Sequence, residues 1–241
     1  MLDSVNLKQI LFLDIETVPQ FASFDEMPEN LKKHWEKKSS FFRDSVQSPQ
    51  ETYNRAGIYA EFGKIICISA GAITGGAADM GFKIKSFFGS NEKTLLESFA
   101  AFVNSLEETK PVFLCAHNGK EFDYPYISRR MLINGIALPK AFDIAGKKPW
   151  EVQHIDTLEL WKFGDYKHYT SLDLLAAVFD IPSPKQQIDG SMVAGVYYTE
   201  NNLPKIVSYC ESDVLAVAQL VMRYMNLPLI EGHRIKVTGQ F

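Results

Sequence analysis

The sequence predicts an α/β fold with one mixed sheet, in which three antiparallel strands are followed by parallel strands. Helices are expected to flank this sheet, and a helical insertion is expected after its first strand. Two observations predict this arrangement. Strongly β-prone runs come first, whereas the later apolar runs alternate with segments of helical spacing. Consecutive strands usually pair antiparallel, and strands separated by helices usually pair parallel. The chain has 241 residues, 46% hydrophobic and 22% charged, which is enough for one large domain with a sizeable core.

The first half of the chain predicts three strands, an insertion and a helix. Residues 9–18 are mostly apolar and are expected to form the first strand. Residues 20–62 are more polar, and their apolar residues fall at helical spacing between prolines, so an insertion of two short helices is expected. Residues 64–74 and 81–89 are β-prone and flank a Gly-Gly turn, which predicts a hairpin. A helix is expected over 91–106, because an asparagine precedes leucines and phenylalanines at helical spacing.

The second half predicts strands that alternate with helices. Short apolar runs indicate strands at 111–118 and 152–157. Helical spacing, cap residues and Gly or Pro stops predict four further helical segments, at 122–136, 169–182, 191–200 and 203–225. We expect residues 1–226 to form a single domain and residues 227–241 to form a C-terminal tail.

Composition and charge exclude several classes of protein. The formal net charge of −4 argues against a protein that coats nucleic acid through bulk positive charge, so any nucleic-acid contact is expected to be local. Three scattered cysteines favour reduced thiols over a disulfide framework. The N-terminal residues lack a signal-peptide pattern, and no apolar stretch approaches the roughly 18 residues of a membrane span. We therefore expect a cytoplasmic protein with no membrane contact.

Two carboxylates interrupt the first predicted strand. Asp14 and Glu16 are two residues apart, so their side chains lie on one face of the strand and within roughly 7 Å of each other. Leu13 and Ile15 make the opposite face apolar. Two buried like charges cost several kcal/mol unless a positive charge compensates them. Either the end of this strand is exposed and the pair is incidental, or a cation binds there.

Two further polar groupings lie at the ends of apolar elements. Asp123 comes just past the buried strand expected at 111–118, and Tyr209 and Asp213 lie one turn apart on one face of the last predicted helix. Each has an ordinary structural interpretation, as a helix cap or as a surface pair. Cys210, beside Tyr209, is expected to point elsewhere on the helix.

The segments FLDIETVP, HNGKEFDYPYI and YCESD resemble the three exonuclease motifs of the DEDD superfamily of 3′–5′ exonucleases, the DnaQ-like proteins with an RNase H-like fold. The second motif is most similar to the exonuclease domain of family B DNA polymerases, and the chain resembles the stand-alone bacterial proteins related to that domain. The resemblance runs from about residue 9 to residue 225. The histidine branch of the superfamily has a His five residues before the last Asp, where this chain has Ser208. Tyr209, four residues before Asp213, resembles the tyrosine branch, DEDDy.

The resemblance implies a two-metal hydrolysis of the terminal phosphodiester of single-stranded DNA. Asp14 would bridge two Mg²⁺ or Mn²⁺ ions, Glu16 and Asp213 would complete the first site, and Asp123 would hold the second. Tyr209, with Glu16, would orient the attacking water. The residues themselves also favour Mg²⁺ or Mn²⁺ over zinc, because the carboxylates offer oxygen ligands and no Cys/His cluster accompanies them.

Substrate contacts are implied for four residues next to the first and second motifs: Thr17, Val18, Asn118 and Phe122. Phe122 equally suits a core position where a strand meets a helix. Arg129 and Arg130 could contact phosphate or simply lie on a solvated face. His117 is expected to have a structural hydrogen-bonding role.

Three functions remain open at this point. The favoured one is a 3′–5′ exonuclease on single-stranded DNA, the second is the same chemistry on RNA, and the third is a nucleic-acid-binding module without turnover. An α/β protein with incidental acids would require three acidic groupings to coincide. No polymerase motif follows the exonuclease region, so any proofreading role would require another protein, a repair or replication partner that the sequence does not identify.

Overall fold

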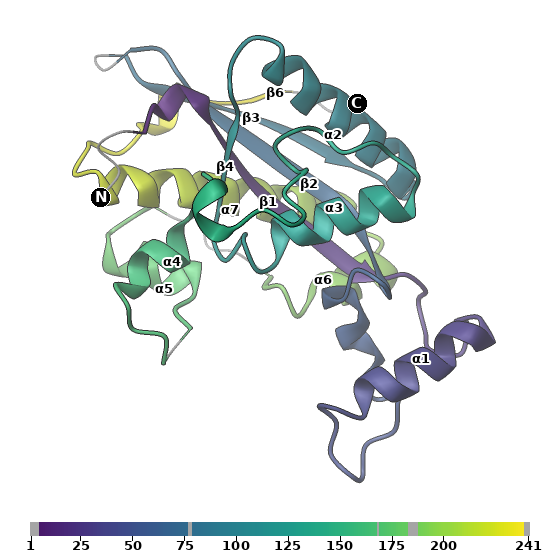
Figure 1. Ribbon diagram of the computed structural model, residues 1–241. Coiled ribbons are helices and arrows are strands. Elements are labelled where there is room, and N and C mark those ends of the chain that lie inside the picture. Colours follow the sequence, from purple (N-terminus) through teal and green to yellow (C-terminus); the bar gives the residue numbers. More distant parts are fainter. Residues whose placement is uncertain (1–4, 77–78, 168, 183–187, 239–241) are drawn as a thin grey trace.

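The computed structural model describes residues 5–76, 79–167, 169–182 and 188–238. These residues form a six-stranded sheet with the strand order β5-β4-β1-β2-β3-β6 (Figure 1). The strands are β1 (Ile10–Pro19), β2 (Gly63–Thr74), β3 (Gly81–Phe88), β4 (Phe113–Ala116), β5 (Ile155–Asp156) and β6 (Ile235–Thr238). The α-helices are α1 (Glu29–Ser39), α2 (Glu92–Glu107), α3 (Asp123–Ile133), α4 (Thr157–Lys162), α5 (Leu172–Val178), α6 (Val193–Tyr198) and α7 (Leu203–Tyr224).

The strand directions confirm the predicted fold class. β1, β2 and β3 pair antiparallel in succession, and β4, β5 and β6 each join the sheet by parallel pairing. The β1–β2 register shifts between Glu16 and Thr17, which places an irregularity at the carboxyl end of β1. Such irregularities bend a strand and redirect its side chains, and they are common next to functional sites.

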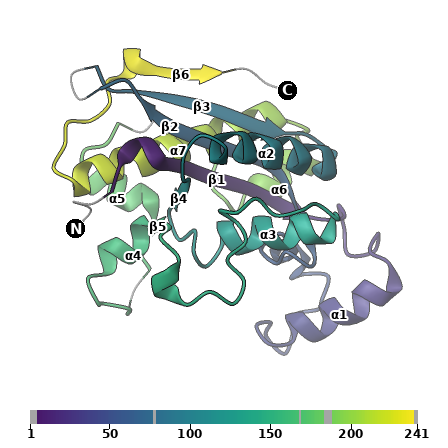
Figure 2. The ribbon, with the colours of Figure 1, turned by 45° about the horizontal axis from the view of Figure 1, so that its top comes forward.

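Helices cover the two faces of the sheet, with α2 and α3 on one face and α7 on the other (Figures 1 and 2). The alternation of side chains along β1 assigns each residue to a face. Leu11, Leu13 and Ile15 pack in the core beneath α2 and α3, whereas Ile10 and Phe12 pack beneath α7. Asp14 and Glu16 share the parity of Ile10 and Phe12 and therefore lie on the α7 side.

The insertion after β1 has a small core of its own. Trp35 of α1 is fully buried, its Nε1 donates to the carbonyl oxygen of Pro49 at 2.9 Å, and it packs against Tyr53 and Phe62. Only the first of the two expected segments is an α-helix. The second, Tyr53–Ile58, is a 3₁₀ helix. Its side chains at 53 and 56 are buried against the insertion core, so tertiary packing determines its conformation.

One α-helix and one strand of the described residues were not anticipated from the sequence. The helix α4 begins directly after β5, where the side chain of Asp156 accepts hydrogen bonds from the backbone N–H groups of Leu158 and Glu159. The strand β6 lies within residues 227–241, the segment expected to be a tail, and pairs parallel with β3 at the edge of the sheet. Among the helices of the described residues, none is long and apolar enough to cross a membrane.

Candidate active site

The carboxyl end of β1 brings two carboxylates to the face of the sheet that α7 covers. Glu16 is only 6% exposed, and the Oδ2 atom of Asp14 is buried without a hydrogen-bond partner among the described residues. Leu13 and Ile15 anchor the strand on its other face, so neither acid can turn away into solvent without displacing the core. The strand therefore fixes two acids side by side in a poorly hydrated position.

A third carboxylate comes from the start of α3. Asp123 is the first residue of this helix and is 3% exposed, and its Oδ1 atom also lacks a partner among the described residues. The turn before it begins at Asn118, whose backbone φ of 63° lies in the left-handed region. The N–H of Phe122 closes this turn on the carbonyl oxygen of Asn118 at 3.0 Å. Because β4 is parallel to β1, the carboxyl ends of the two strands lie on the same side of the sheet, and this turn therefore lies near Asp14.

The helix α7 supplies the remaining polar groups. Tyr209 and Asp213 line one pocket together with Asp14 and Glu16. Cys210 does not line this pocket but lies against Asp14, contrary to the expectation that it points elsewhere. Its Sγ donates to the carbonyl oxygen of Asp14 at 3.4 Å, and one ligand atom each from Asp14, Glu16 and Cys210 lie within 4.8 Å of one another. The helix packs directly over β1, so both adjacent residues 209 and 210 contribute to the site.

The pocket has a volume of about 440 Å³ and is lined by residues from five parts of the chain. The sequence anticipated six of these residues: Asp14, Glu16, Thr17, Phe122, Tyr209 and Asp213. Asp123 does not line this pocket, but it lies close enough for its charge to raise the pKa of Asp14. Val18 and Asn118 do not line the pocket. The side chain of Val18 is fully buried under α6, and Asn118 contributes its backbone turn.

Burial and mutual repulsion set the proton affinity of the carboxylates. The pKa of Asp14 is raised well above its usual value by burial and then by the charges of Asp213 and Asp123. Burial and the charge of Asp14 likewise raise the pKa of Glu16. Burial raises the pKa of Asp123 to about 7. Ionisation of these carboxyls is therefore unfavourable in the absence of a cation. Such clusters of acids with raised pKa values are typical of metal sites, where the bound ion compensates their charge.

The tyrosine of the site stays protonated. Burial, followed by the charges of Asp213 and Glu16, raises the pKa of Tyr209 well above its usual value. Its hydroxyl is therefore a neutral group at physiological pH, able to donate one hydrogen bond and to accept others.

Sequence reasoning missed two contributions to the site. Asp156 is buried at the end of β5 and accepts hydrogen bonds from the backbone N–H groups of Asn118 and Lys120, both at 3.0 Å, which holds the turn that leads to Asp123. The sequence did give one signal for this role, namely the position of Asp156 near the end of a predicted strand. From the insertion, Asn54 and Arg55 line the pocket itself. No local pattern could place them there, because their position depends on how the insertion folds back over β1.

Two other side chains have structural partners. Both ring nitrogens of His117 have hydrogen-bond partners at 2.9 Å, the hydroxyl of Thr157 and the carbonyl oxygen of Thr170, in keeping with the structural role expected for it. Arg130, considered above as a phosphate contact, is 3% exposed and pairs with Glu92 through its Nε at 2.8 Å. The α3 helix turns it toward α2, so it cannot reach a strand in the pocket.

Comparison with known proteins identifies the family of the chain. Residues 58–233 match the family described as "Predicted 3'-5' exonuclease related to the exonuclease domain of PolB". The chain belongs to this family. Membership supports nuclease activity in general and nucleic acid as the class of substrate. The match begins after Asp14 and Glu16, so it is the tertiary structure that brings these two acids together with Tyr209 and Asp213 of the matched region.

A solved structure shows the same fold. The chain is similar to the family B DNA polymerase from the hyperthermophilic archaeon Pyrobaculum calidifontis, with a TM-score of 0.53 and 15% sequence identity. The similarity covers 90% of this chain and 24% of the polymerase chain. The chain thus spans about a quarter of the length of the polymerase that it resembles.

Proposed function

We propose that this protein is a metal-dependent 3′–5′ exonuclease that hydrolyses the terminal phosphodiester of single-stranded DNA. The observation that supports this most directly is the pair of buried carboxylate oxygens, Asp14 Oδ2 and Asp123 Oδ1, that have no hydrogen-bond partner among the described residues. A buried anionic oxygen without a partner costs several kcal/mol, and a bound cation removes that cost. The site residues therefore fit a metal centre. Because β6 belongs to the same sheet, we extend the proposed exonuclease domain past residue 226, where a tail was expected, to include this strand.

The proposed ligands are four carboxylates. Asp14, Glu16 and Asp213 would hold one ion, and Asp14 and Asp123 would hold a second. Their hard oxygen donors suit Mg²⁺ or Mn²⁺. When bound, two such ions neutralise the scissile phosphate and the leaving oxygen and lower the pKa of the attacking water.

The residues of the chain supply the orientation for this reaction. Tyr209 lines the pocket beside Glu16, and its raised pKa keeps the phenol protonated. A neutral phenol is a poor general base, so its role is to hold the attacking water by a hydrogen bond while the carboxylate of Glu16 accepts a hydrogen bond from the same water. Positioning of this kind is worth several kcal/mol of the barrier when the reacting atoms are held in line.

The proposed strand contacts surround the carboxylates. Thr17 and Phe122 line the pocket and lie where a terminal nucleotide would be held, with Phe122 available for stacking against a base. Val18 and Asn118 would contribute only through their backbone. From the insertion, the exposed Arg55, whose guanidinium lies over the ring of Phe42, would contact a phosphate of the strand, which gives the insertion a part in binding.

RNA is the second candidate substrate, since the same carboxylates can cleave either backbone and no described residue is assigned to the 2′-hydroxyl. A binding module without turnover is disfavoured, because a protein that binds without a metal gains nothing from gathering four acids that repel one another.

Degradation of 5′-labelled single-stranded DNA and of matched RNA tests the proposal. Each strand is incubated with Mn²⁺, with Mg²⁺ and with EDTA, and the products are separated by length. We expect metal-dependent shortening from the 3′ end, faster on DNA, and no shortening by the Asp14→Asn variant. Faster shortening of RNA would change the substrate to RNA. Absence of shortening by folded protein with either metal would refute the enzyme and leave the binding module.

A further inference from the structure

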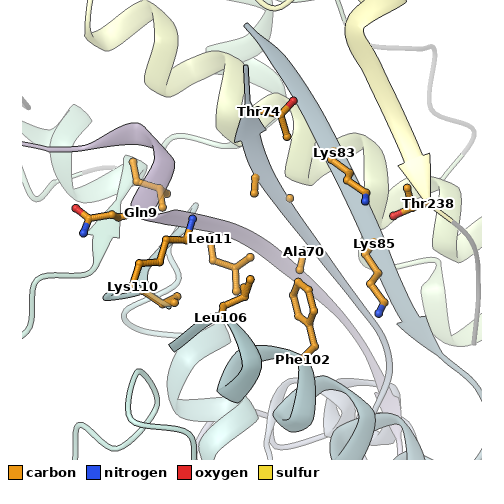
Figure 3. A pocket seen from close by; sticks show the side chains of 14 residues that line it. Gln9, Leu11, Ala70, Thr74, Lys83, Lys85, Phe102, Leu106, Lys110 and Thr238 are labelled. Atoms are coloured by element: carbon orange, nitrogen blue, oxygen red, sulfur yellow. The ribbon is translucent and has the colours of Figure 1, made fainter. Parts of the chain in front are cut away.

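A second pocket lies on the opposite face of the sheet from the carboxylates. It has a volume of about 490 Å³ and opens beyond the C-terminal end of α2 (Figure 3). Leu11, Ala70 and Val112, which are buried, form much of its floor. Phe102 and Leu106 of α2 form a wall, as Figure 3 shows. Leu11 belongs to the α2 side of β1, whereas Asp14 lies on the α7 side, so the two sites do not share a surface.

Three lysines surround this apolar floor. Lys83 and Lys85 extend from β3 on one side, and Lys110 lies on the other side next to β1 (Figure 3). None of the described residues that line the pocket is acidic, although the chain as a whole has a net charge of −4. The pocket therefore combines an apolar cavity with local positive charge.

Lys85 is partly buried and lies close enough to Lys83 to be affected by its charge. The ammonium of Lys85 lies 5.1 Å from the ring centroid of Phe102, above the wall of the pocket. Burial, followed by the charge of Lys83, lowers the pKa of Lys85. An anion that binds here would relieve this repulsion.

The spacing of the charges indicates what kind of ligand fits. Lys83 and Lys85 are two residues apart on one strand, so their backbones are separated by about 7 Å. Lys110 lies across the pocket from them (Figure 3). A single small anion beside Lys83 and Lys85 would leave Lys110, on the other side of the pocket, without a contact. An extended segment with several carboxylates can contact them, while one of its apolar side chains occupies the floor.

We propose that this pocket is a docking site for an acidic peptide segment of a partner protein, anchored by one aromatic or large aliphatic side chain. The position of the site on the face away from the carboxylates lets the partner bind while the active-site pocket stays open. The inference does not depend on the nuclease activity, because it rests on a separate surface.

Fluorescence anisotropy of a fluorescein-labelled peptide, with four aspartates around one phenylalanine, tests this assignment on the full chain. We expect saturable binding that weakens about tenfold or more in Lys83→Glu and in Lys85→Glu. Ala72→Phe, which puts a β-favouring side chain into the pocket from a partly exposed position of β2, is expected to weaken binding by a similar factor. Lys93→Glu makes the same charge change on an exposed part of α2 and is expected to leave binding unchanged.

Two peptide controls and one nucleic acid separate the alternatives. Replacing the phenylalanine by serine, or the aspartates by asparagine, is expected to remove most of the binding. A ten-nucleotide oligothymidine is expected not to displace the peptide. Binding that tolerates Ala72→Phe and is displaced by the oligonucleotide would overturn the proposal in favour of a phosphate-binding patch. Absence of saturable peptide binding to protein with an unchanged melting temperature would also overturn it. Cleavage of a short strand, measured in parallel, is expected to be unaffected by Lys83→Glu.

Discussion

Replacement of Asp123 by asparagine should make the metal-free protein more stable at alkaline pH while it removes activity. In the folded chain burial raises the pKa of Asp123 from its ordinary 3.8 to about 7, so the carboxyl holds its proton more tightly than in the unfolded chain. The stabilisation from this proton is complete below a pH of about 4 and is lost as the pH rises through about 7. The amide side chain of the Asp123→Asn variant does not titrate, so the variant loses nothing at this position over the same range.

The structure sets the size of this effect. A shift from 3.8 to about 7 corresponds to about 4 kcal/mol of differential stability, at about 1.4 kcal/mol for each pKa unit. Between about pH 5 and pH 8 the parent protein should lose about 3 kcal/mol at this site alone. Asp14 and Glu16 have pKa values shifted in the same direction and should steepen the decline.

Urea unfolding in EDTA at these two pH values measures the effect directly. The free energy of unfolding of Asp123→Asn relative to the parent should rise by about 3 kcal/mol from pH 5 to pH 8. Asp143→Asn, at an exposed aspartate, is the matched control and should show no such change. The outcome against the reasoning is a stability difference between Asp123→Asn and the parent that is the same at pH 8 as at pH 5. Burial would then not raise the pKa of Asp123, and the argument for a metal site would lose its basis.

Three further predictions concern neighbouring residues. Tyr209→Phe should lower kcat by at least about tenfold, with little change in the Mn²⁺ concentration that gives the half-maximal rate. If the variant has the same kcat as the parent protein, the water-orienting role is disproved. Arg55→Ala should raise KM for single-stranded DNA several-fold and make KM less dependent on salt concentration. Steady-state kinetics at two salt concentrations would measure both effects, and an unchanged KM would exclude the phosphate contact. Arg130→Met should cost about 3–5 kcal/mol in urea unfolding because Glu92 stays buried without its cation, and a cost below about 1 kcal/mol would contradict the buried pair.

The order and type of most elements follow from the sequence alone. The apolar run 10–19, the hairpin at 63–88 and the periodic helix α7 carry strong local signals, and the structure has each of them within a residue or two of its expected bounds. Successive side chains of a strand point to opposite faces, so Asp14 and Glu16, two residues apart, must share one face of β1. For these segments, local pattern and final structure agree because the periodic apolar face is also what the core buries.

Tertiary structure alone determined the features that depend on contacts between distant segments. β6 has a short, partly charged sequence and forms because the edge of β3 offers it backbone partners. Cys210 lies against Asp14 because α7 packs over β1 at a particular rotation, which helical periodicity within α7 does not set. Arg130 pairs with Glu92 and not with phosphate because α3 turns it toward the start of α2, which the sequence of α3 does not show. Arg55 reaches the pocket that the carboxylates line, and three lysines surround an apolar floor on the opposite face of the sheet. Both arrangements exist only because separate segments of the chain meet there. The sequence determines which residues can share a strand or a helix face, and the packing of those faces determines which of them meet.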